Sequence, residues 1–225
     1  MNNLKPNEKR AKNAIVLIWI VFTLDIASLI SGYMQYNLLT AFNNGAEISA
    51  EAANSNDIRE RVINILYLIA YLISSITFIL WFRRAYYNLH QRVSPLSNTE
   101  GWAAGAWFVP IISLFKPYQI MKELYIETKA LLSKKGITVN INLTTINVWW
   151  TIWIINNFIG QFVFRYSLKA TSIDELITST VAGMINNSVG IFLAIITVKV
   201  IHDYSSAEPL LNEIKDENEP ITTIS

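Results

Sequence analysis

The sequence of 225 residues contains no cysteine. Disulfide bonds, thiolate catalysis and cysteine metal sites are therefore excluded. Charged residues are also scarce at 16%, whereas a soluble domain carries about 25%. Because 52% of the residues are hydrophobic, much of the chain has to face something other than water. The net charge of +1 supplies no general basic field, so we expect no nucleic-acid partner.

Catalytic motifs are missing as well. The chain has no H-E-x-x-H, no G-x-S-x-G and no pair of aspartates inside its apolar stretches. The chain has two histidines, His90 and His202, and Asp203 is the one obvious further metal ligand near them. A metal site needs three or four ligands, so these residues make a poor candidate. We therefore predict a protein that is not an enzyme and that binds no metal and no cofactor.

Four apolar stretches are long enough to cross a bilayer, which takes roughly 20 residues for about 30 Å of hydrocarbon. They are residues 14–34, 62–82, 143–164 and 176–198. The predicted fold class is all-α, an integral membrane helical bundle with four transmembrane helices. Basic residues precede the first stretch as in a signal peptide, but no A-x-A-like cleavage site follows. We favour an uncleaved signal anchor over a cleaved signal.

The flanking segments complete this layout. Residues 1–13 are expected to be a cytoplasmic N-terminal segment, and residues 204–225 an acidic, disordered cytoplasmic tail. A fifth apolar stretch, residues 101–115, is too short to span and contains Pro110, which suits a re-entrant or an interfacial segment. Residues 118–135 repeat apolar side chains at helical spacing and stop at Gly136, which predicts a cytoplasmic amphipathic helix on the bilayer or against the bundle.

The lysines and arginines set the orientation. With four spans and a cytoplasmic N-terminus, 14 of the 18 cationic residues fall on the cytoplasmic side, and the exterior loops keep only Arg59, Arg61, Arg165 and Lys169. If residues 101–115 crossed the membrane, the lysines from Lys116 to Lys135 would move outside and the bias would vanish. The positive-inside rule therefore predicts four spans with both termini in the cytoplasm.

Two runs resemble the signatures of a known family. The first is WFRRAYYNL, residues 81–89, and the second is GWAAGAWFVP, residues 101–110, continued by FKPYQ, residues 115–119. In these runs the chain is similar to the bacterial membrane proteins catalogued as domain of unknown function 4328, and the likeness in layout covers about residues 14–203. The resemblance implies a four-span domain of a bacterial cytoplasmic (inner) membrane, with no assigned activity, substrate or cofactor.

Asp25 is the first candidate site residue. It lies near the middle of the first span, where a carboxylate costs roughly 2.5–3.5 kcal/mol. The other spans carry polar residues at comparable depth: Ser74, Ser75, Asn156, Asn157, Asn186 and Asn187. We hypothesise that they form a midplane polar layer. This layer is either a proton or cation site of a small transporter or channel, or a set of interhelical hydrogen bonds and close packing contacts; we favour the second interpretation.

A second candidate lies at the cytoplasmic face. Its members are basic and aromatic, and they could clamp an anionic lipid headgroup or simply anchor the span ends: Arg83, Arg84, Trp102, Trp107 and Lys116. We predict a non-enzymatic membrane domain that anchors, scaffolds or modulates partners. The alternative function is a small transporter or channel that uses Asp25. The expected partners are the lipid bilayer, anionic lipids included, and either another membrane protein or a second copy of the chain.

Overall fold

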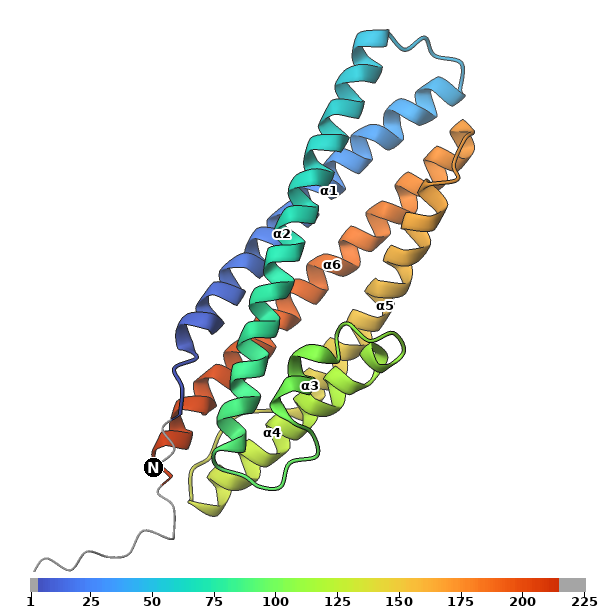
Figure 1. Ribbon diagram of the computed structural model, residues 1–225. Helices are drawn as coiled ribbons and strands as arrows, with labels where there is room; N and C mark the ends of the chain where they lie inside the picture. Colours follow the sequence, from blue (N-terminus) through green and yellow to red (C-terminus); the bar gives the residue numbers. More distant parts are fainter. Residues whose placement is uncertain (1–3, 215–225) are drawn as a thin grey trace, which may run out of the picture. The chain divides into compact units, whose positions relative to one another are not determined.

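The computed structural model describes residues 4–214, and these residues form helices, turns and loops without a strand. The all-α prediction is therefore confirmed for this part of the chain. The elements in order are α1 (Glu8–Asn43), α2 (Ala50–His90), α3 (Glu100–Gly105), η1 (Ile112–Leu114), α4 (Lys116–Lys134), α5 (Leu143–Ser167), α6 (Ile173–Ala207) and η2 (Glu208–Asn212) (Figure 1).

The prolines explain where the long helices can run. Proline lacks the amide hydrogen that an inner helical turn needs, and its ring clashes with the preceding turn. None of the six prolines falls within α1, α2, α5 or α6. The helices extend well beyond the predicted spans, and residues 44–49 alone connect α1 to α2.

Three helices are long and apolar enough to cross a membrane: α1, α2, and α6 together with η2. The predicted span 143–164 does form a helix, α5, but this helix is not among the three. Asn147, Asn156, Asn157 and Gln161 interrupt its apolar run. The structure thus supports three of the four predicted spans by length and composition.

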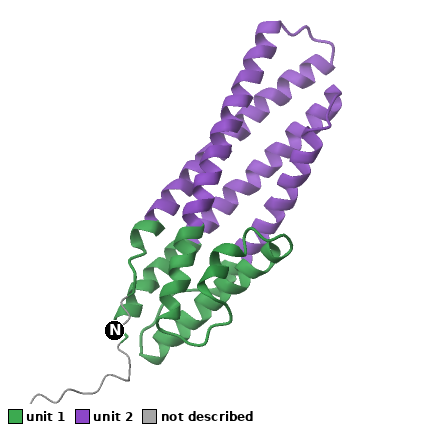
Figure 2. Ribbon diagram, viewed as in Figure 1, with its two compact units in different colours: residues 1–11, 79–146, 200–225 green, residues 12–78, 147–199 purple. Residues whose placement is uncertain are grey.

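The chain divides into two compact units, which Figure 2 colours separately. Unit 1 comprises residues 1–11, 79–146 and 200–225, and unit 2 comprises residues 12–78 and 147–199. Each of the helices α1, α2, α5 and α6 contributes residues to both units. Unit 1 therefore collects both ends of the chain and the long segment that follows α2.

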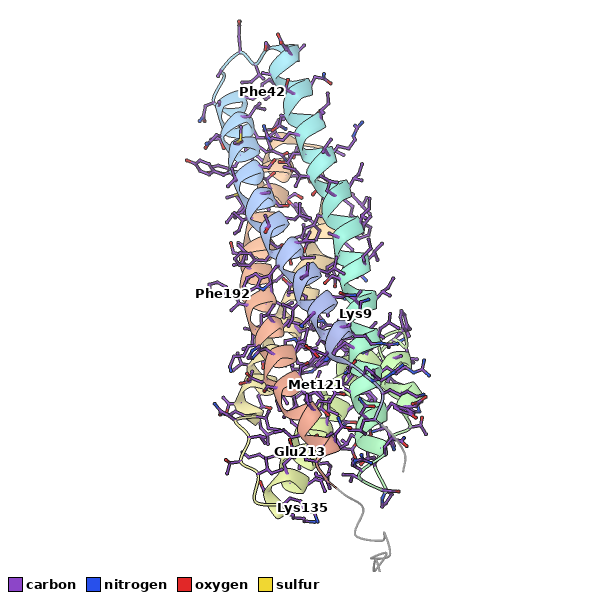
Figure 3. The ribbon with its side chains drawn as sticks, turned by 90° about the vertical axis from the view of Figure 1, so that its left-hand side faces the viewer. Lys9, Phe42, Met121, Lys135, Phe192 and Glu213 are labelled. Carbon is purple, nitrogen blue, oxygen red and sulfur yellow. The ribbon has the colours of Figure 1, made fainter. Side chains whose placement is uncertain are left out.

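Unit 2 exposes its large apolar side chains. Phe192 is labelled in Figure 3 and is 64% exposed. Five apolar residues of α1, α2 and α5 are each more than half exposed: Val16, Ile30, Leu68, Ile76 and Phe158. Such a surface is unfavourable in water and normal in contact with lipid.

Unit 1 has a core of large buried side chains. Trp81 and Tyr86 of α2 and Tyr204 of α6 are fully buried, as are four apolar residues on one face of α4: Ile120, Met121, Leu124 and Leu132 (Met121 is labelled in Figure 3). This face belongs to the helix predicted for residues 118–135. The helix ends where expected, because Gly136 has φ +76° and its amide and that of Ile137 bond the carbonyls of Ser133 and Leu132.

The expectation of a disordered tail from residue 204 is wrong for residues 204–214. α6 continues to Ala207 and η2 follows it. The reason is an apolar face at helical spacing, made by Tyr204, Ala207, Leu211 and Ile214, all of which are buried. The prediction of disorder was based on the acidic residues of this segment and did not take the apolar spacing into account. The rest of the predicted tail, residues 215–225, lies outside the described residues.

Candidate functional site

Asp25 lies inside unit 2, and its side chain is only 1% exposed. The Tyr67 hydroxyl of α2 is its hydrogen-bond partner. On its other side α6 passes so closely that a Cβ atom added to Gly190 would lie 2.9 Å from Asp25 Oδ1 and 3.0 Å from Oδ2. Glycine is therefore the residue that lets α6 approach the carboxylate.

A second close approach joins α5 to α6. A Cβ atom added to Gly160 would lie 3.5 Å from Asn186 Oδ1, and Asn186 is one helical turn before Gly190. Three acceptor oxygens of unit 2, on α1, α5 and α6, are buried without a hydrogen-bond partner: Asp25 Oδ1, Asn156 Oδ1 and Asn186 Oδ1. We call the set Asp25, Tyr67, Asn156, Gly160, Asn186 and Gly190 the polar layer.

The predicted set is only partly brought together. Ser75 Oγ donates to the Tyr71 carbonyl at 2.8 Å and Asn157 Nδ2 to the Trp153 carbonyl at 2.8 Å, so both bond their own helices. Ser74 is buried and Asn187 is half-buried. Tyr67 was missed by the sequence reasoning, because which faces of α1 and α2 meet depends on how the helices pack.

The polar layer has a defined chemistry. A buried carboxylate without a cationic neighbour is costly unless a proton or a bound cation neutralises it. Tyr67 supplies a hydrogen-bond donor, and the two asparagine oxygens supply further acceptors. The polar layer can therefore bind a proton at Asp25, or it can serve only as a packing contact where the helices approach one another at glycines.

A charged network in unit 2 was also missed. Arg59 Nε donates to Ser31 Oγ at 2.8 Å and Arg59 Nη2 to Asn56 Oδ1 at 2.5 Å, and Ser31 also bonds Glu60. Gln35 Nε2 extends the network to Thr180 Oγ1 at 2.9 Å. The network lies near the start of α2, which begins at Ala50 and carries Arg59 and Glu60 against Ser31 of α1.

The aromatic and basic candidates lie in unit 1 but form no single clamp. Arg83 Nη2 pairs with Glu100 Oε1 at 3.1 Å, and the Arg84 guanidinium lies 6.0 Å from the centre of the Tyr87 ring. Trp107 packs edge-on against Phe82 with ring centres 6.4 Å apart. Trp102 is 38% exposed, and Lys116 is half-buried at the first position of α4. Arg83 and Trp107 thus fasten α3 and the turn after it to the end of α2.

The turn after α3 presents apolar side chains to the outside. Phe108 and Ile111 are each 74% exposed, and Val109, Leu114 and Phe115 are exposed as well. Ile111 has φ +66°, a conformation that is strained for a β-branched residue and costs about 1–3 kcal/mol. Residues 101–115 are therefore a short helix, a turn and a 3₁₀ turn with an apolar edge.

Glu208 joins three segments of unit 1. Its carboxylate accepts hydrogen bonds from Asn7 Nδ2 at 2.9 Å and from Asn88 Nδ2 at 2.7 Å. The Asn88 side chain also forms two hydrogen bonds of 2.9 Å with the Lys5 backbone: Oδ1 accepts from the Lys5 amide, and Nδ2 donates to the Lys5 carbonyl. We call Lys5, Asn7, Asn88 and Glu208 the terminal clasp. Burial raises the pKa of Glu208, which lies outside the predicted span 176–198, although its hydrogen bonds act in the opposite direction.

A second carboxylate in unit 1 behaves differently. Glu123 of α4 accepts a hydrogen bond of 2.5 Å from the Tyr86 hydroxyl and one of 2.7 Å from the Ser97 amide. Burial alone would raise the pKa of Glu123, but these hydrogen bonds outweigh it and the pKa is lowered. Within residues 4–214, no group of three or more His, Asp or Glu side chains lies close enough to hold a metal ion.

The comparisons with known proteins give one match. The family described as Domain of unknown function (DUF4328) matches residues 44–206. The match contains both signature runs, 81–89 and 101–110, but it begins after α1, whereas the resemblance in layout had been extended to residue 14. Asp25 and Asn7 thus lie outside the matched part. No curated protein and no solved structure matches the chain.

Proposed function

Since the chain belongs to the family described as Domain of unknown function (DUF4328), whose description assigns no activity, we propose its function from the geometry. The protein is a four-span, non-enzymatic membrane anchor that holds unit 1 at the cytoplasmic face of a bacterial membrane as a scaffold for partner proteins. The terminal clasp is the observation that carries this proposal. It joins the segment before α1, the end of α2 and the segment after α6, which the proposed spans separate along the chain.

The clasp supports α5 as the fourth span. Because a hydrogen bond of 2.7 Å joins Asn88 to Glu208, the end of α2 and the end of α6 have to lie on the same side of any membrane that the helices cross. Between these residues the chain runs through α5 and α6, and only an even number of crossings returns it to the same side. α6 is long and apolar enough to cross, so α5 crosses too. Its 25 residues give about 37 Å, which exceeds the hydrocarbon thickness.

The cationic residues support the cytoplasm as the location of unit 1. Unit 2 contains six of the 18 lysines and arginines, and the other twelve belong to unit 1; the six are Lys12, Arg59, Arg61, Arg165, Lys169 and Lys199. Lys12 and Lys199 adjoin the limits of unit 2. The positive-inside rule assigns the cation-rich side to the cytoplasm.

Close packing in unit 2 supports a structural role. A Cβ atom added to Gly32 would lie 3.0 Å from Met184, just as one added to Gly190 would touch Asp25. Asp25 itself is almost fully buried. Helices that approach at glycines and bury their polar residues are typical of a rigid bundle, and such a bundle suits an anchor better than a conduit.

Labelling of single cysteines tests the topology directly, because the native chain has no cysteine to remove. In intact cells a membrane-impermeant maleimide should label Asn44→Cys and Lys169→Cys, which lie in the two exterior loops. Lys134→Cys on α4 should react only after the cells are permeabilised. Labelling of Lys134→Cys in intact cells, or release of the protein from membranes by alkaline washing, would refute the anchor.

A second function, proton or cation translocation through Asp25, is favoured by one observation, the buried Asp25 Oδ1 without a partner. Protein reconstituted in liposomes separates the two functions. The scaffold predicts no proton or alkali-cation flux for the native protein. Flux that Asp25→Asn abolishes without loss of fold would establish translocation instead.

A further inference from the structure

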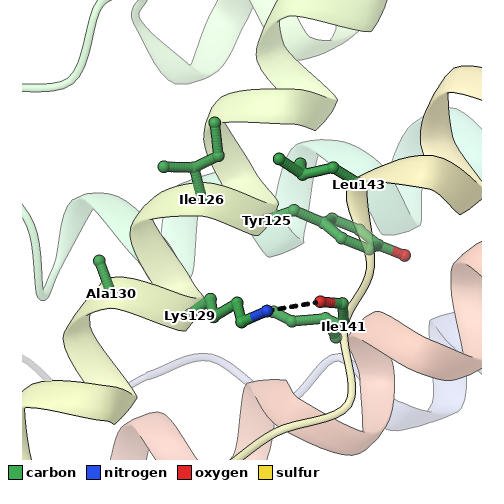
Figure 4. A pocket seen from close by; sticks show the side chains of 6 residues that line it. All are labelled: Tyr125, Ile126, Lys129, Ala130, Ile141 and Leu143. Carbon is green, nitrogen blue, oxygen red and sulfur yellow. Dashed lines mark hydrogen bonds between the residues drawn. The ribbon is translucent and has the colours of Figure 1, made fainter.

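Unit 1 contains a small cavity that no site described so far uses. Its volume is about 310 Å³, and Figure 4 shows the six side chains that line it: Tyr125, Ile126, Lys129 and Ala130 of α4, and Ile141 and Leu143 near the start of α5. Ligand cavities measure about 300–1,000 Å³, so this one suits part of a narrow chain and not a bulky metabolite.

The lining is apolar except at one point. The Tyr125 hydroxyl donates to the Val200 carbonyl at 2.7 Å, so that the tyrosine contributes its ring to the wall. Ile126, Ala130, Ile141 and Leu143 add aliphatic surface. Such a cavity offers a polar ligand few partners and offers an alkyl chain dispersion contacts and shelter from water.

Lys129 supplies the single charge. Its ammonium donates to the Ile141 carbonyl at 3.5 Å, the far limit of a hydrogen bond, as the dashed line in Figure 4 shows. In the described part of the chain no acidic side chain forms an ion pair with it. The ammonium therefore retains donors for an anion at the mouth of the cavity.

From this combination we propose that the cavity binds an anionic phospholipid, with one acyl chain against Tyr125, Ile141 and Leu143 and the phosphate on Lys129. The ligand has to be amphiphilic, because an apolar wall beside one cation complements an alkyl chain that ends in a negative charge. A single ammonium at the surface is too weak to hold free phosphate. This site is separate from the Arg83–Glu100 region, whose arginine is already paired.

The position of the cavity in the chain agrees with this ligand. Leu143 is the first residue of α5 and of the predicted third span. Under the proposed topology it lies where the chain enters the cytoplasmic leaflet, within reach of the lipid acyl chains. That part of the argument rests on the proposed function, whereas binding in detergent solution does not.

Native mass spectrometry of the full chain in detergent tests the proposal. Phosphatidylglycerol and phosphatidylcholine with the same acyl chains are titrated against the native protein and three variants. Lys129→Gln removes the charge, and Ala130→Phe fills the cavity and keeps the charge. Lys134→Gln is the matched control, because Lys134 lies five residues along α4, about 140° around the helix, and does not line the cavity.

The native protein should retain phosphatidylglycerol in preference to phosphatidylcholine. Lys129→Gln should lower its apparent affinity for phosphatidylglycerol roughly fivefold and abolish the preference, as expected for loss of one partly exposed ion pair. Ala130→Phe should weaken both lipids, and Lys134→Gln should behave as the native protein. Millimolar inorganic phosphate should not compete.

Three results would overturn the site. They are equal retention of the two lipids by the native protein, equal effects of Lys129→Gln and Lys134→Gln, and unchanged binding by Ala130→Phe. Competition by inorganic phosphate would reassign Lys129 to a free anion. Because these measurements use detergent solutions, they can fail while the topology experiment succeeds, and the reverse also holds.

Discussion

Unit 1 and unit 2 use their residues in opposite ways. Unit 2 turns large apolar side chains such as Phe192 outward and buries Asp25, Ser31 and glycines. Unit 1 fully buries large aromatic residues of α2 and α6, Trp81 and Tyr204 among them, whereas Trp102, Phe108 and Phe115, in and after α3, are exposed. Lipid does not drive apolar side chains together, so a membrane bundle relies on small residues and internal polar contacts, whereas water drives large apolar side chains into a core. The difference between the units is the one expected under the proposed topology, with unit 2 in lipid and unit 1 in water.

Breaking the terminal clasp should have the largest effect, and it should be confined to unit 1. Asn88→Ala removes one bond to the buried Glu208 and two to the backbone of Lys5, which should cost roughly 3 kcal/mol. Hydrogen exchange measured by mass spectrometry should rise in residues 200–212 and stay unchanged in residues 20–34. Equal acceleration in both regions would mean that the two units do not respond separately.

Crowding the polar layer should have a smaller effect, in unit 2. Gly190→Ala places a methyl group 2.9 Å from Asp25 Oδ1, and such overpacking typically costs about 1–3 kcal/mol. Gly183→Ala is the matched control, because a Cβ atom there meets nothing within 4 Å, and it should be neutral or stabilising. Thermal unfolding in detergent compares the two variants. A Gly190→Ala protein as stable as Gly183→Ala would show that α6 does not press against Asp25.

The pH dependence should separate two carboxylates of unit 1. The raised pKa of Glu208 means that the folded state binds its proton more tightly, so its contribution to the free energy of unfolding falls as pH rises above 4.5 through the raised pKa. Glu123 has a lowered pKa, so its contribution is present above 4.5 and is lost as pH falls through the lowered pKa.

Stability profiles against pH check both signs. Glu208→Gln should remove the loss above pH 4.5, and Glu123→Gln should remove the loss on the acid side. Identical profiles for the two variants, or profiles that match the native protein, would contradict this assignment.

The exposed turn after α3 should give the smallest change in stability. Phe108→Cys removes a 74% exposed ring and should alter the free energy of unfolding by no more than about 0.5 kcal/mol. A bimane label on Phe108→Cys should show blue-shifted emission in liposomes, because the apolar edge contacts lipid. The same label on Ser97→Cys, which is also exposed, should emit as in water. Equal emission from both positions would place the turn in water.

Much of the helical layout is predictable from local patterns. Gly136 ends α4 where a positive φ is needed, and the apolar spacing of α4 specified its buried face. α5 is less clear, because Asn156 and Asn157 lower its hydropathy, and the proposal that it crosses the membrane rests on a contact between distant residues and not on composition. Residues 204–214 were misjudged because acidic residues outweighed a short apolar repeat.

The candidate sites depend more on packing between helices. Asp25 and the small residues of α6 could be recognised by their depth in the spans, but their pairing with Tyr67 and Gly190 depends on helix rotation, which no single segment specifies. The arrangement of the second candidate set depends on packing in a similar way, since Glu100 is close enough to pair with Arg83 only once α3 has folded against α2. The cavity at Lys129 needs α4 and the start of α5 together.

The clasp also imposes an order in time. Asn7 and Asn88 leave the ribosome early, but their carboxylate partner is residue 208 and emerges only after all the long helices have been synthesised. Until then the two asparagines can bond only their other partners, the Trp81 carbonyl for Asn7 and the Lys5 backbone for Asn88. Under the proposed topology the helices therefore insert before the clasp is complete, and its closure is a late step of biogenesis.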